Sequence, residues 1–138
     1  MPQPGQEIKR ANGFVLRIDS LDDELLAMEA HYQGDAPLAQ NHLHPSQDEH
    51  FEVLDGTIHA VIDGEERFYE AGETFEIPAG TPHQMAAKGP TRTRWEVRPA
   101  LRTAEFMERM YDALDNGFPE GTTGEDFLAE YSDVFRLA

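Results

Sequence analysis

Apolar and polar residues alternate in several short runs through the middle of the chain. The runs are residues 51–54, 57–62, 66–70, 74–77 and 91–98. Alternation with a period of two is typical of a strand that buries one face. The dipeptides Asp55-Gly56 and Asp63-Gly64 separate consecutive runs and predict hairpin turns, because such turns need a positive φ that glycine adopts easily. This part of the chain therefore predicts an antiparallel β structure.

The N-terminal part is less regular. Residues 14–19 form a short apolar run, which predicts a strand. Residues 20–33 allow two interpretations, because they begin like a helix capping box and then alternate from residue 26 as a strand does. We favour a strand for the second half of this stretch. The Gly-Asp-Ala-Pro sequence at 34–37 breaks the chain after it.

The period of the apolar residues changes after Pro99. Thr103 is placed to cap a helix whose apolar residues recur at helical spacing. These apolar residues are Phe106, Met107, Met110, Tyr111 and Leu114. Thr123 predicts the cap of a second helix over residues 125–137. The apolar faces of both helices need a partner, either the outer face of the β sheet or a second subunit, and we expect a homodimer.

Seven or eight closely spaced strands followed by two helices predict a mainly β protein, either a sandwich or a barrel. Residues 1–12 contain two prolines and a glycine without periodicity, and they predict a flexible N-terminal arm. We expect residues 13–98 to form this sandwich or barrel. We expect residues 99–138 to form a C-terminal helical segment.

The composition narrows the classes of partner. The 138 residues include 11 basic and 27 acidic side chains, a net charge of −16. Such an acidic protein repels nucleic acid and anionic membrane surfaces. The chain has no cysteine, which excludes disulfides, thiolate zinc sites and a cysteine nucleophile. No apolar run approaches the roughly 18 residues of a membrane helix, and the first residues lack the apolar centre of a signal peptide, so we expect a cytoplasmic protein.

Four residues carry the chemistry of a metal site. His42 and His44 are two positions apart, so in a strand both imidazoles point to one face. Glu49 follows after a short turn, and His83 follows the proline-rich turn at 78–82. Three neutral imidazoles and one carboxylate suit a first-row divalent metal, and they leave coordination positions open for water, oxygen or substrate.

The same residues carry a resemblance to a known family. The sequence His42-x-His44, four residues, Glu49, six residues and Gly56 is similar to the first motif of the cupin superfamily. In that family a glycine usually stands five residues before the first histidine. Here seven residues separate Gly34 from His42, which predicts a longer entry loop.

The second cupin motif is also present. The sequence Gly72, five residues, Pro78-x-Gly80, two residues and His83 resembles it in every spacing. The motif usually ends in asparagine, whereas Ala87 stands there in this chain. That asparagine is not a metal ligand in the family, so the departure leaves the expected metal site intact.

The resemblance implies a double-stranded β-helix, or jelly-roll barrel, with a metal in its mouth. The implied ligands are His42, His44, Glu49 and His83, and the implied cofactor is one divalent transition metal, either Fe, Mn, Ni, Zn or Cu. We expect a metal-dependent enzyme that acts on a small organic molecule, and we favour a dioxygenase-like oxidoreductase in which Glu49 also acts as a base. The alternatives are a non-redox isomerase, cyclase or lyase, and a non-catalytic cupin that binds a small ligand.

Strand phase also predicts the walls of a substrate pocket. Gln40 is in phase with His42 and His44, Phe51 with Glu49, and Met85 with His83. Arg94 shares one strand face with Arg92 and Arg98. An inward Arg94 would hold a substrate carboxylate, whereas an outward one would form a surface ion pair. His31, His50 and His59 are interpreted as ordinary histidines outside the site.

Overall fold

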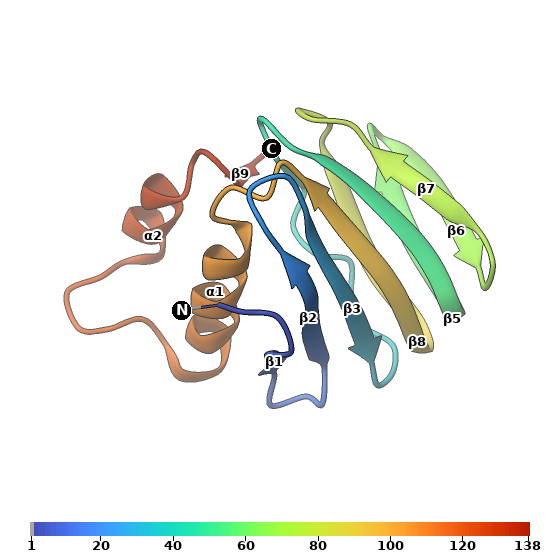
Figure 1. Cartoon of the computed structure of the whole chain (residues 1–138), viewed down its shortest axis with the longest axis horizontal. Coiled ribbons are helices and arrows are strands. Elements are labelled where there is room, and N and C mark those ends of the chain that lie inside the picture. Colours follow the sequence, from blue (N-terminus) through green and yellow to red (C-terminus); the bar gives the residue numbers. More distant parts are fainter. Residues whose placement is uncertain (1) are drawn as a thin grey trace.

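A computed structural model describes residues 2–138 (Figure 1). Within them the chain forms nine strands and two helices. In chain order these are β1 (Glu7–Lys9), β2 (Val15–Leu21), β3 (Leu26–Tyr32), β4 (His42–Leu43), β5 (Asp48–Ile62), β6 (Glu65–Glu70), β7 (Thr74–Ile77), β8 (His83–Arg98), α1 (Thr103–Asn116), α2 (Gly124–Glu130) and β9 (Arg136–Leu137). Neither helix in this range is long and apolar enough to cross a membrane.

The long strands β5 and β8 organise the sheet. They pair antiparallel along their whole length, from Asp48 opposite Arg98 to Ile62 opposite His83. The register shifts on both sides of Asp55. A bulge bends a strand and increases its twist, so each long strand passes from one layer of the fold into the other.

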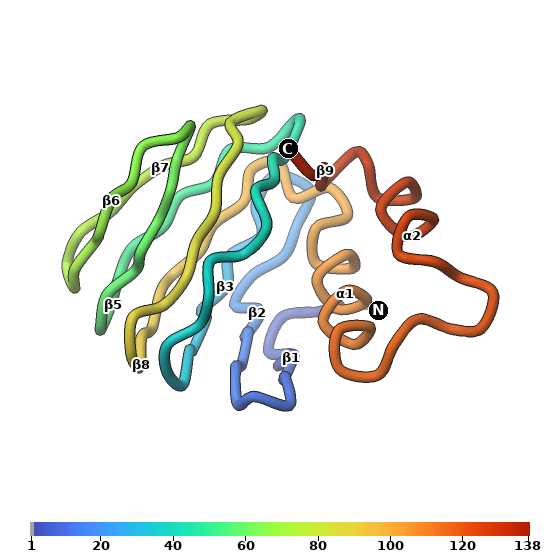
Figure 2. The backbone as a smooth tube through the Cα atoms, turned by 180° about the vertical axis from the view of Figure 1, so that it is seen from behind, coloured from blue at the N-terminus to red at the C-terminus, as the bar shows by residue number. Residues whose placement is uncertain are grey.

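The other strands add to the two halves of this pair. In one layer, β3 pairs with the C-terminal half of β8, β2 with β3 and β1 with β2, while β7 pairs with the N-terminal half of β5. In the other layer, β4 pairs with the start of β8 and with β9, and β6 pairs with the C-terminal half of β5. Every pairing is antiparallel. The back view shows the sheet curving over itself, with both helices gathered at one end (Figure 2). The predicted mainly β jelly-roll with two C-terminal helices is confirmed.

The core lies between the two layers that the curved sheet forms. Strands β2 and β3 contribute alternate apolar side chains that are almost fully buried, namely Leu16, Ile18, Leu26 and Met28. From the other strands Val53, Ile58, Ile77 and Val97 complete this core. Each such side chain stabilises the fold by roughly 1.5–3 kcal/mol.

The two Asp-Gly dipeptides behave differently. Asp63-Gly64 forms the predicted hairpin, with φ of 51° and 81°, between β5 and β6. The hairpin predicted at Asp55-Gly56 is wrong, because β5 runs through it as a bulge. Gly56 has φ +85°, and a Cβ there would lie 2.4 Å from the carbonyl oxygen of Pro90. Close approach of β8 therefore decides the conformation at this glycine.

The prediction of a flexible arm over residues 1–12 is wrong for its second half. β1 pairs with β2, and Ile8 is buried in the core. The backbone N–H of Gly5 also donates to the carbonyl of Ile18 at 2.7 Å. One apolar residue and an unpaired edge of β2 suffice to order this segment. Met1 lies outside the described residues.

The C-terminal segment differs from its prediction in three respects. Arg102 stands at the N-cap of α1, while Thr103 is buried and accepts a hydrogen bond from Gln47 Nε2 at 2.6 Å. The capping box at Thr123 is present, but α2 ends at Glu130, well before residue 137. Both helices lie at the open end of the curved sheet, not on its outer face (Figure 1). Phe106 and Met107 of α1 are therefore buried inside the same subunit, whereas Leu114 stays exposed.

Candidate metal centre

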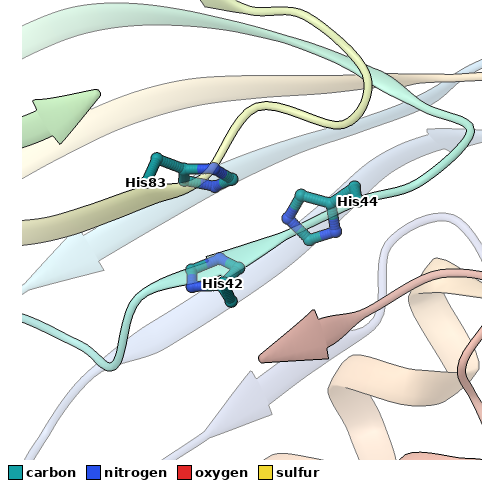
Figure 3. A group of neighbouring side chains, drawn as sticks. All are labelled: His42, His44 and His83. Atoms are coloured by element: carbon teal, nitrogen blue, oxygen red, sulfur yellow. The ribbon is translucent and has the colours of Figure 1, made fainter. Parts of the chain in front are cut away.

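Three imidazoles meet at the open end of the barrel. His42 begins β4, His44 follows that strand, and His83 begins β8 directly opposite His42. Ring centroids lie 4.2 Å apart for His42 and His83, 5.2 Å for His42 and His44, and 5.3 Å for His44 and His83. One nitrogen from each ring lies within 4.8 Å of the others. Figure 3 shows the three rings around one common space.

Each imidazole is oriented by a backbone carbonyl. In all three rings Nδ1 faces the oxygen, at 2.8 Å from Gln40 for His42, 2.7 Å from Val134 for His44 and 2.9 Å from Thr81 for His83. A carbonyl oxygen only accepts hydrogen bonds, so Nδ1 carries the hydrogen. The lone pair of a neutral ring is then on Nε2, which is the arrangement found in metal-ligating histidines.

Glu49 projects from β5 into the same space and is fully buried. Its Oε1 lies 3.2 Å from Nε2 of His44 and 3.1 Å from Nε2 of His83. Its Oε2 accepts a hydrogen bond from the indole N–H of Trp95 at 2.7 Å. Burial alone would raise the pKa of Glu49, but the imidazoles of His44 and His83 hold it well below its usual range.

These contacts fit a cation. Glu49 Oε1 has no hydrogen-bond donor among residues 2–138. When the imidazoles of His44 and His83 are neutral, their Nε2 lone pairs face the lone pairs of this oxygen. Such an arrangement needs a proton or a metal ion. Two ligand atoms about 2.1 Å from one ion lie about 3.0–3.4 Å apart, which matches the observed separations. Three imidazoles and a carboxylate suit Mn, Fe, Ni, Cu or Zn.

Protonation of the two neighbouring histidines differs. Burial and the nearby imidazole of His83 lower the pKa of His42 to about 4. Burial also acts to lower the pKa of His44, but the hydrogen bond and charge of Glu49 outweigh it and raise that pKa. The carboxylate of Glu49 therefore favours the protonated form of His44. A metal ion that binds there competes with this proton.

The C-terminal tail forms part of this centre. Besides the Val134 carbonyl on His44, the ring of Phe135 stacks on His42 with 4.8 Å between centroids. Strand β9 pairs with β4, and the two strands run side by side in Figure 3. The N–H of Ala138 donates to the carbonyl of Asn41 at 2.9 Å. The tail thus fixes the strand that carries two of the imidazoles.

A cavity of about 820 Å³ opens beside the metal-ligand cluster. His42, His44, Glu49 and His83 are among the residues that line it. Many of the other lining residues come from the loop that follows β3 and from α1. The lining is mainly apolar and aromatic, as is typical of sites for small organic molecules.

Residues 28–97 match the family described as Cupin domain, which is half of the chain. This chain belongs to the cupin family. No curated protein matches its sequence.

Solved structures share the fold of this cupin at low sequence identity. KdgF from a Halomonas species is 22% identical, with a TM-score of 0.62 over 68% of this chain and 86% of that one. An RmlC-like cupin from Shewanella frigidimarina is 19% identical, with a TM-score of 0.64 over 72% and 87%. Pac13 of Streptomyces, described as a nucleoside dehydratase, is 14% identical in a structure with uridine, with a TM-score of 0.59 over 72% and 79%.

The structure brings together the four ligands predicted for this cupin. Phe51 and Met85 line the cavity as predicted. Gln40 also lines it, and its backbone carbonyl holds the ring of His42. The pocket position predicted for Arg94 is wrong. Arg94 is exposed and pairs with Glu52 at 3.2 Å, because β8 turns Trp95 inward and its neighbours outward.

The remaining histidines lie outside the centre. His50 and His59 pair with Glu76 and Glu66 at 3.3 and 2.8 Å, and His31 lies 3.7 Å from Glu29. Sequence reasoning missed the contacts that Trp95, Val134 and Phe135 make with the ligands. The strand phase of Trp95 was available as a signal, whereas nothing local to Val134 marks its carbonyl.

Proposed function

We propose that this cupin is a metal-dependent enzyme acting on a small organic molecule. One observation carries the proposal: Nε2 of His44 and Nε2 of His83 lie 3.2 and 3.1 Å from the same carboxylate oxygen of Glu49, in the wall of a cavity of about 820 Å³. The metal would supply Lewis acidity and a fixed point for donor atoms of the substrate.

The residues of the site either bind the ion or orient a residue that binds it. His42, His44, His83 and Glu49 would hold the ion. Trp95 keeps Glu49 in place through Oε2, so only Oε1 is free to bind the ion or accept a proton. The lowered pKa of Glu49 makes it a weak base at neutral pH, which favours its role as a ligand over its expected role as a base.

Dioxygenase-like oxidation is the reaction class we propose first. The cavity walls are mainly apolar, which suits entry of dioxygen and exclusion of water. This chemistry needs a redox-active metal such as Fe, Mn, Ni or Cu. A non-redox isomerase, cyclase or lyase is the second candidate. The fold shared with Pac13, described as a nucleoside dehydratase, supports it, and bound Zn would favour it.

Elemental analysis of protein purified without added metal is the first test. We expect about one equivalent of a divalent transition metal. His44→Ala is expected to lose it and to keep the far-UV dichroism of a folded β protein, because the core lies away from the ion. His50→Ala is the matched control, since His50 pairs with Glu76 on the outer face. Full metal content in His44→Ala would contradict the ligand assignment.

Oxygen uptake then separates the reaction classes. The metal-loaded protein is tested with phenols, diketones and thiols in an oxygen electrode. Uptake above that of His44→Ala supports the dioxygenase. Binding without uptake, but with conversion of the compound, supports the non-redox enzyme. Binding without any conversion supports a non-catalytic ligand-binding cupin.

We also propose a homodimer in the cytoplasm. Leu114 and Leu137 remain 59% and 49% exposed after α1 and β9 have packed on the barrel. A second subunit would cover these two side chains. Light scattering that gives the monomer mass of 15.6 kDa would contradict the dimer.

A further inference from the structure

Two tyrosines from distant parts of the chain line the cavity. Tyr32 ends β3, and Tyr111 lies in α1, which is outside the matched cupin domain. The ring of Phe14 contacts both, with centroid distances of 5.0 Å to Tyr32 and 5.4 Å to Tyr111. These contacts fix the position of both phenol rings.

Neither the hydroxyl of Tyr32 nor that of Tyr111 forms a hydrogen bond with any group among residues 2–138. Both tyrosines line the cavity. Both tyrosines are half-buried, and a tyrosine hydroxyl withdrawn from bulk solvent usually has a hydrogen-bond partner. Burial raises the pKa of Tyr32 to about 12 and also raises that of Tyr111. Both phenols therefore stay protonated at neutral pH and present O–H donors to the cavity.

Apart from the metal-ligand cluster, the charged side chains of the cavity wall already have partners. Arg10 binds Asp115 at 3.2 Å, and the N–H of Ala11 donates to the same carboxylate at 2.9 Å. Asp35 accepts a hydrogen bond from the N–H of Gly89. Among the described residues of the wall, no cation is free to hold a carboxylate or a phosphate. The net charge of −16 also disfavours anions.

We propose that Tyr32 and Tyr111 form a subsite for an uncharged acceptor oxygen, a carbonyl or hydroxyl group on a substrate with an apolar or aromatic body. The body lies against apolar wall residues that include Phe14, Met85, Met110 and Phe135. This inference rests on the proposed function, because it assigns the substrate class of the same cavity.

Three naphthalene probes of similar shape test the subsite. They are 2-acetylnaphthalene, which has the acceptor, 2-isopropenylnaphthalene, which replaces C=O by C=CH₂, and the anion 2-naphthoate. Binding is measured by ligand-observed NMR, both on the protein as purified and after removal of metal with a chelator. We expect the acetyl probe to bind about fivefold more tightly than either of the others in the metal-free protein, where no metal contributes.

The tyrosine variants locate the effect. Tyr32→Phe and Tyr111→Phe are each expected to remove most of the preference for the acetyl probe. Tyr69→Phe is the control, because Tyr69 packs on Phe75 outside the cavity wall. In the metal-free protein, equal binding of the acetyl and isopropenyl probes, tighter binding of naphthoate, or an unchanged preference in both variants would overturn the subsite.

The metal content of the same samples separates this inference from the proposed function. A protein that binds no metal but keeps the tyrosine-dependent preference contradicts the enzyme and retains the subsite. A protein that binds metal through His44 but shows no such preference retains the proposed function and overturns the subsite.

Discussion

The imidazole Nδ1 of His44 lies 2.7 Å from the backbone oxygen of Val134, a residue 90 positions further along the chain. The contact orients a predicted metal ligand from a segment outside the matched cupin domain. Phe135 stacks on His42 beside it. The last residues of the chain therefore act as positioning residues for the metal centre.

Removal of residues 134–138 is expected to weaken metal binding by about 10–100-fold, because His44 and His42 lose the contacts that hold their rings. Affinity is measured by competition with a chromophoric chelator, with far-UV dichroism as the test of folding. Phe135→Ala is the milder variant and removes only the stacking on His42. Unchanged affinity in both variants, with the fold intact, would show that the tail has no influence on the ligands.

Trp95→Phe is expected to lower the free energy of unfolding by about 1–3 kcal/mol, because it leaves buried Glu49 Oε2 without its hydrogen-bond donor. Thr93→Val is the contrasting variant on the same face of β8. Thr93 Oγ1 is buried without a partner, so its removal is expected to leave the stability unchanged or raised. Urea unfolding of metal-free protein measures both. A Trp95→Phe variant as stable as Thr93→Val would contradict the role of the indole N–H.

The low pKa of His42 predicts a pH dependence of the metal-free protein. The folded pKa is about 4 and the ordinary value is 6.5, so below pH 6.5 the unfolded chain binds a proton that the folded chain does not. The contribution of neutral His42 to stability is full above pH 6.5 and is lost as the pH falls to about 4. His44 acts in the opposite direction, because its pKa is raised.

Urea midpoints at pH 7.5 and pH 5.0 test this dependence. His42→Gln removes the group whose pKa is lowered, so its midpoint is expected to fall less between the two pH values than that of the parent protein. An equal fall in both proteins would assign the pH dependence to other groups.

Gly56→Ala is expected to destabilise the protein more than Gly64→Ala. Both glycines have a similar positive φ, of 85° and 81°, so both variants incur the roughly 1–2 kcal/mol of a left-handed residue. Only at Gly56 does the new Cβ also meet backbone, the carbonyl of Pro90 at 2.4 Å. Thermal unfolding of the two variants measures the difference. Equal midpoints would mean that β8 moves aside without loss of stability.

Local patterns in the sequence predicted a mainly β fold, the cupin motifs and the four candidate ligands, but not β1 or the continuity of β5. The period of two in a strand decides which side chains share a face. The spacing of His42, His44, Glu49 and His83 matches family motifs, and each motif covers one short region of the chain. These signals lie within a few residues of the atoms they place. They therefore survive in the sequence as a readable pattern.

The neighbours that complete the site follow from contacts between distant segments of the folded chain. The dipeptides at 55–56 and 63–64 are identical, yet the first is a bulge because Pro90 approaches it and the second is a hairpin. The inward turn of Trp95, the tyrosines of the cavity and the carbonyl of Val134 on His44 likewise depend on how distant segments pack. Local periodicity carries no information about such contacts, since the free energy that selects them comes from surfaces that meet only when the chain has folded.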